Sequence, residues 1–261
     1  ILFDRGGRNV YLCDSFGIKE RYESSENVIN AGISAQGKVF VIKEQYGYKS
    51  ELVVFNSGLD EKDCFIWDSA ETYLTDAVFS DKNVLTAVGI VPAENSFDTV
   101  VYRIDSKNGK KLSSYVFNDQ TAVSVFAREA GAATVMTTSS IIKINAEEAR
   151  TVYSFDTLGV DVFAQNGRYA VIASVARVST QTDKISFVDA DGNLRFTKEF
   201  SGVRDVAAVG DECYVLTDGV VYGFDIYGNM KFETKVSEAH EIRSGNGRVF
   251  CVGSEKASYI G

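Results

Sequence analysis

The stretch Gln36-Gly37-Lys38-Val39-Phe40-Val41-Ile42 decides the fold, because copies of its pattern return throughout the chain. A turn containing Gly or Asn is followed within a residue or two by a short run of β-branched, aromatic and other apolar residues. The copies are spaced by about 42 residues, which is the period of a four-stranded propeller blade. The other turns are Asp81-Lys82-Asn83, Ala130-Gly131, Asn166-Gly167-Arg168, Gly210-Asp211 and Asn246-Gly247-Arg248. The repeat therefore predicts a β-propeller.

A second set of turns with the same period lies half a unit further along the chain. In this set an apolar strand ends in Asp or Asn and then meets Gly, as in Phe224-Asp225-Ile226-Tyr227-Gly228-Asn229. Gly and Asn accept the positive φ that such turns need, and Asx side chains bond to the nearby backbone. Two independent sets of turns with one period make a chance pattern improbable. Each unit then supplies four strands, A to D from the axis outward, and we expect almost no helix.

The count of units favours seven blades, with six or eight as alternatives. We expect one domain, residues 1–261, with blade units at 1–26, 27–70, 71–120, 121–158, 159–202, 203–240 and 241–261. The first unit supplies strands B, C and D without A, and the last supplies A, B and C without D. Both terminal blades are therefore predicted to be incomplete. The start at Ile1, inside an apolar strand, suggests that the parent protein extends beyond this piece.

The composition fits a folded domain and excludes some functions. The hydrophobic content is 45%, and a single Pro and the lack of low-complexity runs argue against linkers. The net charge of −9 argues against binding to nucleic acid, which rewards clustered Lys and Arg. No apolar stretch approaches the roughly 20 residues of a membrane span, and no signal peptide is present. A membrane anchor or export signal would have to lie outside this chain.

The four cysteines and the single histidine give little sign of chemistry. Cys13, Cys64, Cys213 and Cys251 have no metal-ligand spacing, so we expect no metal and no cofactor. Buried free thiols are the favoured interpretation, and a disulfide remains open if the domain is exported. His240 stands alone in a loop, and no nucleophile elbow accompanies it, which disfavours serine hydrolysis.

An acidic turn resembles the start of a calcium loop. Asp189-Ala190-Asp191-Gly192-Asn193 has the D-x-D-G pattern, but the sister turn at Asp225 lacks the second carboxylate. A repeated hairpin turn explains both, so we do not expect a metal here.

Uneven loop length is the better indication of a binding site. B-to-C loops are expected to be extended at residues 44–49, 89–98 and 174–184, and loops on a rigid frame commonly carry binding residues. Tyr46, Tyr48, Arg177 and Thr182 are the candidate partner-binding residues, and Phe97 is a further exposed aromatic residue. Tolerated surface insertions are the alternative.

Four acids on expected A strands support a second, enzymatic hypothesis. Asp76, Asp161, Asp205 and Glu241 would approach the propeller axis, where propeller glycosidases place paired carboxylates. A glycan-active hydrolase or lyase would need one of them to have a raised pKa. The alternative is that these acids accept hydrogen bonds from neighbouring A strands.

The turn-and-strand elements at 33–42 and 79–88 look like those of WD40-like and quinoprotein-like propellers. More closely, residues 1–9 with Tyr46-Gly47-Tyr48-Lys49-Ser50 resemble a clostridial (Firmicutes) family of membrane-anchored propellers of unknown function. That resemblance implies a short cytoplasmic tail, one transmembrane helix and an extracytoplasmic propeller on the cell-surface side. It brings no catalytic residues. Trp67 is the only tryptophan, which disfavours the repeated tryptophan motifs of quinone-dependent propellers.

The sequence thus favours a non-catalytic binding or protein-interaction module. Its ligand would be a protein or a cell-wall glycan, it would bind no nucleic acid, and it would meet a membrane only through a segment outside this chain. The glycan-active enzyme is the alternative.

Overall fold

The computed structural model describes residues 1–81, 83–128, 131–155, 160–166, 168–175, 182–245 and 247–260. Within these residues there are strands and turns and no α-helix, as the sequence predicts. The strands form seven antiparallel sheets, of which five have four strands and two have three. The chain is therefore an all-β propeller, and the prediction of repeated four-stranded sheets is confirmed.

The chain divides into two compact units, Ile1–Thr151 and Val152–Gly261, and the division falls inside β15. The first unit begins with a three-stranded sheet, followed by three four-stranded sheets. Its strands are β1 (Leu2–Phe3), β2 (Asn9–Asp14), β3 (Gly17–Glu23); β4 (Val28–Ile33), β5 (Val39–Lys43), β6 (Ser50–Phe55), β7 (Cys64–Ser69); β8 (Tyr73–Asp81), β9 (Val84–Pro92), β10 (Phe97–Asp105), β11 (Lys111–Phe117); and β12 (Ala122–Ala127), β13 (Ala133–Thr137), β14 (Ser140–Ile144), β15 (Ala149–Ser154).

The second unit has two four-stranded sheets and ends with a three-stranded one. Its strands are β16 (Val162–Gln165), β17 (Tyr169–Ser174), β18 (Asp183–Asp189), β19 (Leu194–Phe200); β20 (Asp205–Val209), β21 (Glu212–Leu216), β22 (Val220–Asp225), β23 (Met230–Lys235); and β24 (Ala239–Gly245), β25 (Arg248–Gly253), β26 (Ala257–Ile260). The first described sheet thus lacks strand A and the last lacks strand D, as predicted.

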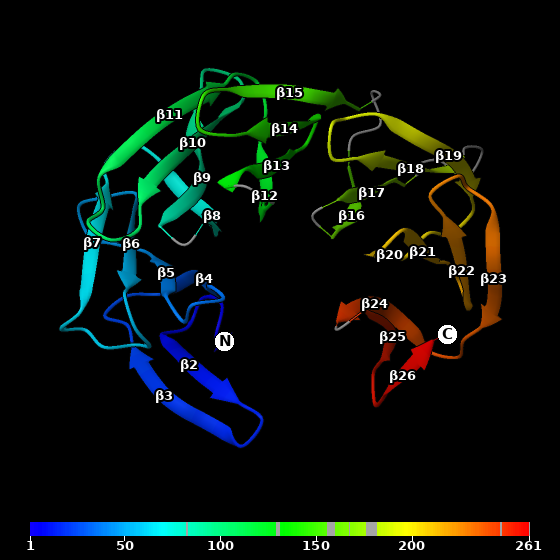
Figure 1. The fold of residues 1–261 in the computed structure, drawn as a ribbon, viewed down its shortest axis with the longest axis horizontal. Helices are drawn as coiled ribbons and strands as arrows, with labels where there is room; N and C mark the ends of the chain where they lie inside the picture. The colour runs from blue at the N-terminus through cyan, green and yellow to red at the C-terminus, as the bar shows by residue number, and fades with distance from the viewer. Residues whose placement is uncertain are drawn as a thin grey trace. The chain divides into compact units, whose positions relative to one another are not determined.

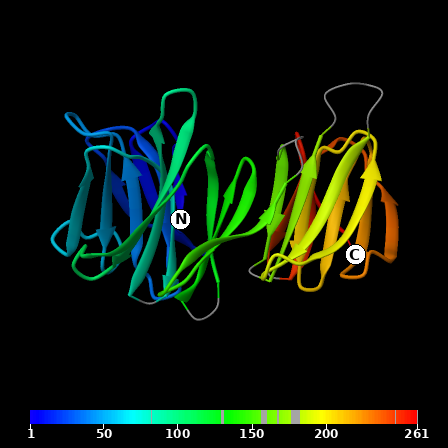
Figure 2. The ribbon, with the colours of Figure 1, turned by 90° about the horizontal axis from the view of Figure 1, so that it is seen from above.

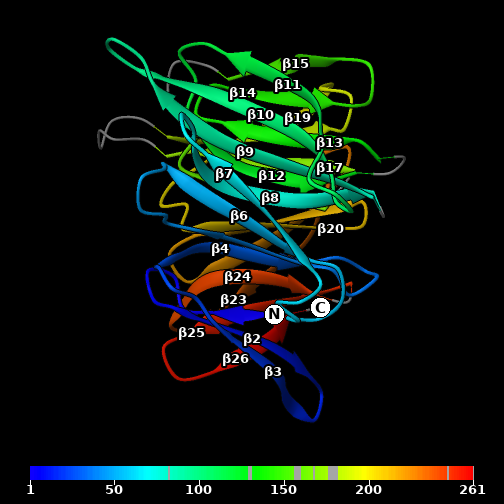
Figure 3. The same cartoon turned by 90° about the vertical axis from the view of Figure 1, so that its left-hand side faces the viewer.

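In every sheet the strands follow chain order from the innermost to the outermost. Within the first unit β4 lies beside β8, and β8 lies beside β12, whereas β7 and β11 form outer edges (Figure 1). Figure 3 views this unit from its outer side, with β7 and β11 towards the viewer. Within the second unit β20 lies between β16 and β24. Sheets therefore pack face to face inside each unit.

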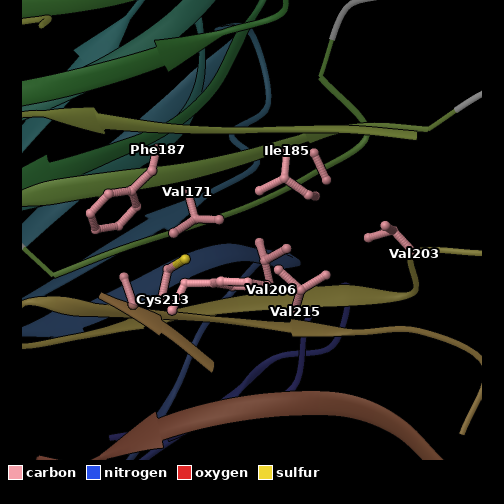
Figure 4. Close-up of a cluster of buried hydrophobic side chains, with 10 residues drawn as sticks. Val171, Ile185, Phe187, Val203, Val206, Cys213 and Val215 are labelled. Carbon is pink, nitrogen blue, oxygen red and sulfur yellow. The ribbon is translucent and has the colours of Figure 1, made fainter. Parts of the chain in front are cut away.

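The hydrophobic core is divided into layers between neighbouring sheets. One layer joins the sheet β16–β19 to the sheet β20–β23, and Figure 4 shows Phe187 and Ile185 facing Cys213 and Val215 across it. These side chains are at most 1% exposed. Ile185 and Phe187 are two positions apart on β18, as are Cys213 and Val215 on β21, so each pair lies on one face of its sheet.

A β-bulge near the start of most innermost strands sets which residues reach the next sheet. The register shifts between Val28 and Asn30 on β4, and between Leu74 and Asp76 on β8. The same shift occurs before Ser124 on β12 and before Glu241 on β24. The extra residue bends the strand and re-aims the side chain that follows it.

The expected loop at 89–98 is wrong for most of its length. Residues 89–92 and 97–98 are paired strand, with Phe97 opposite Pro92 and Val100 opposite Gly89, so only residues 93–96 form the turn. Pro92 stands at the strand end, where a missing N–H does not break the ladder. Figure 2 shows this β9–β10 hairpin projecting beyond the other hairpins of the first unit.

Candidate functional site

Four exposed aromatic side chains lie on loops and strand ends at one edge of the first unit's sheets. Tyr46 and Tyr48 lie between β5 and β6, Tyr73 begins β8, and Phe97 begins β10. Their exposed fractions are 94%, 46%, 41% and 45%. In an antiparallel sheet the loops from strand B to strand C and from strand D to the next strand A lie at the same ends of the strands. The four aromatic residues therefore share one side of the unit. We call these four residues the aromatic loop face.

Lys49 links two parts of the aromatic loop face. Its Nζ donates a hydrogen bond to the hydroxyl of Tyr73 at 3.1 Å and lies 4.9 Å from the centroid of the Tyr73 ring. The 44–49 loop is also bonded at its start, where Asn27 Nδ2 donates to Glu44 Oε2 at 2.9 Å. These contacts restrain the loop that carries Tyr46 and Tyr48.

A network of hydrogen bonds lies beneath the aromatic loop face and joins neighbouring sheets. Ser50 Oγ donates to the carbonyl of Thr72 at 3.0 Å and accepts from the N–H of Leu74 at 3.0 Å. The hydroxyls of Thr72 and Tyr102 lie 2.7 Å apart and share a hydrogen bond. Satisfied polar networks of this kind rigidify the groups that they join. The aromatic residues above them are therefore presented on a stiff support.

The other two candidate binding residues are not among the described residues of the first unit. Thr182 lies in the second unit and donates from its Oγ1 to Glu199 Oε2 at 3.0 Å. Arg177 lies outside the described residues. Sequence reasoning missed Tyr73 as a member of the face. Its position directly before an A strand, at the edge shared with the B-to-C loops, is the signal that would have included it.

Asp76 connects three innermost strands of the first unit. Its Oδ1 accepts from Asn30 Nδ2 on β4 at 2.8 Å, and its Oδ2 accepts from Ser124 Oγ and the N–H of Val125 on β12 at 2.6 and 2.9 Å. Burial raises the pKa of this carboxyl, and the bonds from Ser124, Val125 and Ala77 oppose that rise. The arrangement suits a structural acceptor, because both carboxylate oxygens are already occupied.

Asp205 has the equivalent place on β20 of the second unit. Its Oδ2 accepts from the N–H of Ile242 at 2.8 Å and from Arg243 Nη1 at 2.9 Å, while Oδ1 accepts from the N–H of Val206. The carboxylate is almost fully buried beneath this guanidinium. Asp205 therefore joins β20 to β24.

The remaining two acids differ from this pair. Glu241 is exposed and accepts from Arg243 Nη2 at 2.6 Å. Asp161 lies one position before β16, and its Oδ2 accepts from the N–H of Val175 at 2.8 Å. Asp76 on β8 and Asp205 on β20 hold equivalent positions in their strands. On β16 that position is held by Val162, which pairs with Ala173.

The carboxylate of Asp189 accepts hydrogen bonds from residues of its own turn. Oδ1 accepts from the N–H groups of Asp191 and Asn193, each at 2.9 Å, and Oδ2 pairs with Arg195 at 2.8 Å. The hydrogen bonds from Asn193 and Asp191 and the charge of Arg195 hold the pKa of Asp189 below its usual value in spite of burial. The geometry is that of a hairpin turn.

Two cysteines, Cys213 and Cys251, are buried, Cys13 and Cys64 are partly buried, and His240 is exposed. All four cysteines are free thiols, and burial raises the pKa of Cys213 to about 12. His240 Nε2 lies 3.1 Å from Ser254 Oγ. Among the described residues, no group of three His, Cys, Asp or Glu side chains is placed to hold a metal ion. In the same part of the chain, no helix has the length and apolar character that a membrane crossing requires.

The fold and the surface define a β-propeller with an exposed, supported aromatic face. Residues 1–260 match the family of unknown function DUF5711, and the chain belongs to that family. No curated protein matches the chain.

Solved structures similar to the chain include propellers that carry protein partners. Sqt1 from Chaetomium thermophilum is similar with a TM-score of 0.62 at 14% identity, over 98% of this chain and 79% of that one. Another Sqt1 structure holds the N-terminus of ribosomal protein L10. BBS1N, in complex with ARL6DN, is similar with a TM-score of 0.59 at 9% identity, over 97% and 86% of the two chains.

An enzyme is also among the similar structures. Acylaminoacyl peptidase from Pyrococcus horikoshii has a TM-score of 0.59 at 10% identity, and the match covers 97% of this chain but 47% of the peptidase. At these identities the similarities concern the fold alone.

Proposed function

We propose that this propeller is a non-catalytic module that binds a protein partner through the aromatic loop face. The observation that carries the proposal is the exposure of Tyr46, Tyr48, Tyr73 and Phe97 on a face held by bonded loops. Tyrosine and phenylalanine bury much area for few rotatable bonds, which makes them common anchors of protein interfaces. Sqt1 and BBS1N, which were solved with protein partners, support this kind of role.

The glycan-active alternative receives less support. It would require free carboxylates near the propeller axis, but the oxygens of Asp76 and Asp205 accept bonds from neighbouring innermost strands. A carboxylate that holds two strands together is poorly suited to exchange a proton with substrate.

The test is affinity capture from an extract of the source cells with three forms of the protein. Wild type and Phe16→Ala are expected to retain the same discrete partner, and Tyr46→Ala/Tyr48→Ala is expected to lose at least ten-fold of it. Phe16 is a matched control because it is 93% exposed but lies in the β2–β3 turn, at the opposite edge of the sheets. Equal capture by all three proteins would contradict the proposal.

We also propose that the propeller faces the extracytoplasmic side of a bacterial membrane, attached through a segment outside this chain. The resemblance of residues 1–9 and 46–50 to a membrane-anchored family supports this placement. Protease added to intact cells is then expected to digest the propeller. Survival of the propeller until the cells are lysed would contradict the placement.

A further inference from the structure

A cavity of about 300 Å³ lies between the first two sheets of the first unit. Tyr22 of β3 forms one wall, and side chains of β5, β6 and β7 form the others. Ile66 of β7 lines the cavity and is 58% exposed, so the cavity opens to solvent on that side. β1 lies at the edge of the first sheet away from β3, so the strand on which the chain begins forms no wall of the cavity.

Two oppositely charged side chains lie at one end of this cavity. Lys43 and Glu51 are directly opposite each other on β5 and β6 and are 6% and 4% exposed. Lys43 Nζ lies 2.8 Å from Glu51 Oε1 and donates to Ser25 Oγ at 3.0 Å. Within the described part of the chain, the third N–H of Lys43 and the second oxygen of Glu51, Oε2, have no partner. A buried donor and a buried acceptor therefore remain for a ligand.

The repeat does not require an ion pair at this place. Lys43, Gly89 and Thr137 are equivalent, because each pairs with the residue directly before the bulge of an innermost strand. Val100 is opposite Gly89 as Glu51 is opposite Lys43. The attraction between two buried charges often fails to offset the cost of removing them from water. Packing of the sheets alone thus does not account for the pair.

A further carboxylate, that of Glu61, lies at the other end of the cavity. Phe55 is four residues after Glu51 on β6, which is about 13 Å along a strand. Cys64 is opposite Phe55, and its Sγ donates to the carbonyl of Glu61 at 3.4 Å. The Glu61 side chain is exposed and has no ion-pair partner among the described residues. Between the two ends Val53 and its partner on β7 make an apolar wall.

Both carboxylates act on the walls of the cavity. Burial raises the pKa of Tyr22; the charge of Lys43 opposes this rise, and the charges of Glu61 and Glu51 add to it. Burial also raises the pKa of Cys64, and Glu61 and Glu51 are again among the charges that add to it. The lining has three glutamates and one lysine, so it favours a ligand of net positive charge.

The order of charges along the cavity defines the ligand that would match it. A carboxylate would accept from Lys43, and an ammonium beside it would donate to Glu51. An aliphatic chain would follow along the apolar wall, and a second cation would pair with Glu61. A basic α-amino acid has these groups in this order.

We propose that the cavity binds a free basic α-amino acid of the size of lysine. Its α-carboxylate accepts from the third N–H of Lys43, and its α-ammonium donates to Glu51 Oε2. Its methylene chain lies against Val53 and Ile66, and its ε-ammonium pairs with Glu61. Charge-assisted bonds of this kind are the stronger class of hydrogen bond. The site uses no residue of the aromatic loop face, so it goes beyond the function proposed above and is tested separately.

The test is isothermal titration calorimetry of the purified protein with lysine and three analogues. Lysine is expected to bind saturably at one site. Norleucine lacks the ε-ammonium, cadaverine lacks the α-carboxylate, and each is expected to bind at least ten-fold more weakly. Nα-acetyl-lysine methylamide stands for a lysine inside a polypeptide and is expected to bind at least ten-fold more weakly as well.

Variants at exposed glutamates make the test specific. Glu61→Gln is expected to weaken lysine binding at least ten-fold and to keep norleucine binding within about two-fold, because norleucine has no group for Glu61 to hold. Glu71→Gln changes an exposed glutamate outside the cavity and is expected to keep lysine binding within about two-fold. Circular dichroism checks that both variants fold.

Three results would overturn the proposal. An absence of lysine binding to wild type would leave the ion pair of Lys43 and Glu51 only as a closure of the 44–49 loop. Unchanged lysine binding by Glu61→Gln, or equal binding of lysine, norleucine and cadaverine, would remove the basis for selecting a basic amino acid. Equal binding of lysine and Nα-acetyl-lysine methylamide would mean that the occupant is a side chain of a polypeptide.

Discussion

At the scale of single residues, Asp76 and Asp205 connect neighbouring innermost strands through the hydrogen bonds that they accept. Sequence alone places Asp76 and Asp205 on A strands, but it does not reveal their donors. The donors on neighbouring sheets lie 37 to 49 positions away, such as Ile242 for Asp205 and Val125 for Asp76. The bulge that aims Asp76 at both neighbours is equally invisible in the sequence, since one extra residue leaves no mark in a period of about 42.

Replacement of Asp76 tests this connecting role. Asp76→Ala removes the acceptor of the N–H of Val125 and the shorter of the two hydrogen bonds that Asn30 Nδ2 donates. We expect a loss of about 2–3 kcal/mol in the free energy of unfolding. Glu241→Ala is the control, because its exposed ion pair with Arg243 is expected to contribute at most about 0.5 kcal/mol. Urea unfolding measures both. Equal losses for the two variants would contradict the connecting role of Asp76.

The raised pKa of Asp76 also predicts a pH dependence. Burial raises the pKa above the usual 3.8, so the folded state holds this proton more tightly than the unfolded chain does. Stability from this group is then greatest below pH 3.8 and is lost as pH rises through the folded pKa. Relative to Asp76→Asn, wild type should lose stability as pH rises through that window. A gain in the stability of wild type relative to Asp76→Asn over the same pH range would contradict a raised pKa of Asp76.

At the scale of elements, the strands were predictable and their lengths were not. Gly and Asn turns locate the hairpins, because only a few residue types accept the required φ, as Gly37 does at +84°. The β9–β10 hairpin was mistaken for a loop because Pro92 and the polar residues after it break the apolar pattern. Cross-strand pairing between Phe97 and Pro92 extends the ladder regardless.

The aromatic layer between sheets provides a prediction at this scale. Phe200 on β19 packs against Tyr222 and Phe224, whereas the equivalent Val236 borders a cavity. Phe200→Ala is expected to cost about 3 kcal/mol of unfolding free energy, and Val236→Ala about 1 kcal/mol. Thermal and urea unfolding would compare them. A larger loss of unfolding free energy for Val236→Ala than for Phe200→Ala would contradict this difference in packing.

At the scale of the whole molecule, the repeat predicted seven sheets with one strand missing from each terminal sheet. It could not predict the cavities beside β7 and β26, because these depend on side-chain volumes in two sheets at once. It identified Tyr46 and Tyr48 as exposed loop residues, but not their grouping with Tyr73. That grouping depends on Lys49, which bonds across to the next sheet.

Site-specific photo-cross-linking tests whether the aromatic loop face binds a protein. A benzophenone amino acid placed at Tyr46, and separately at Phe16, reports which edge of the sheets touches a partner in source cells. We predict a discrete adduct with a second polypeptide from position 46, reduced when Tyr48→Ala and Tyr73→Ala are added, and none from position 16. An adduct from position 16 alone, or no adduct from either position, would contradict the claim.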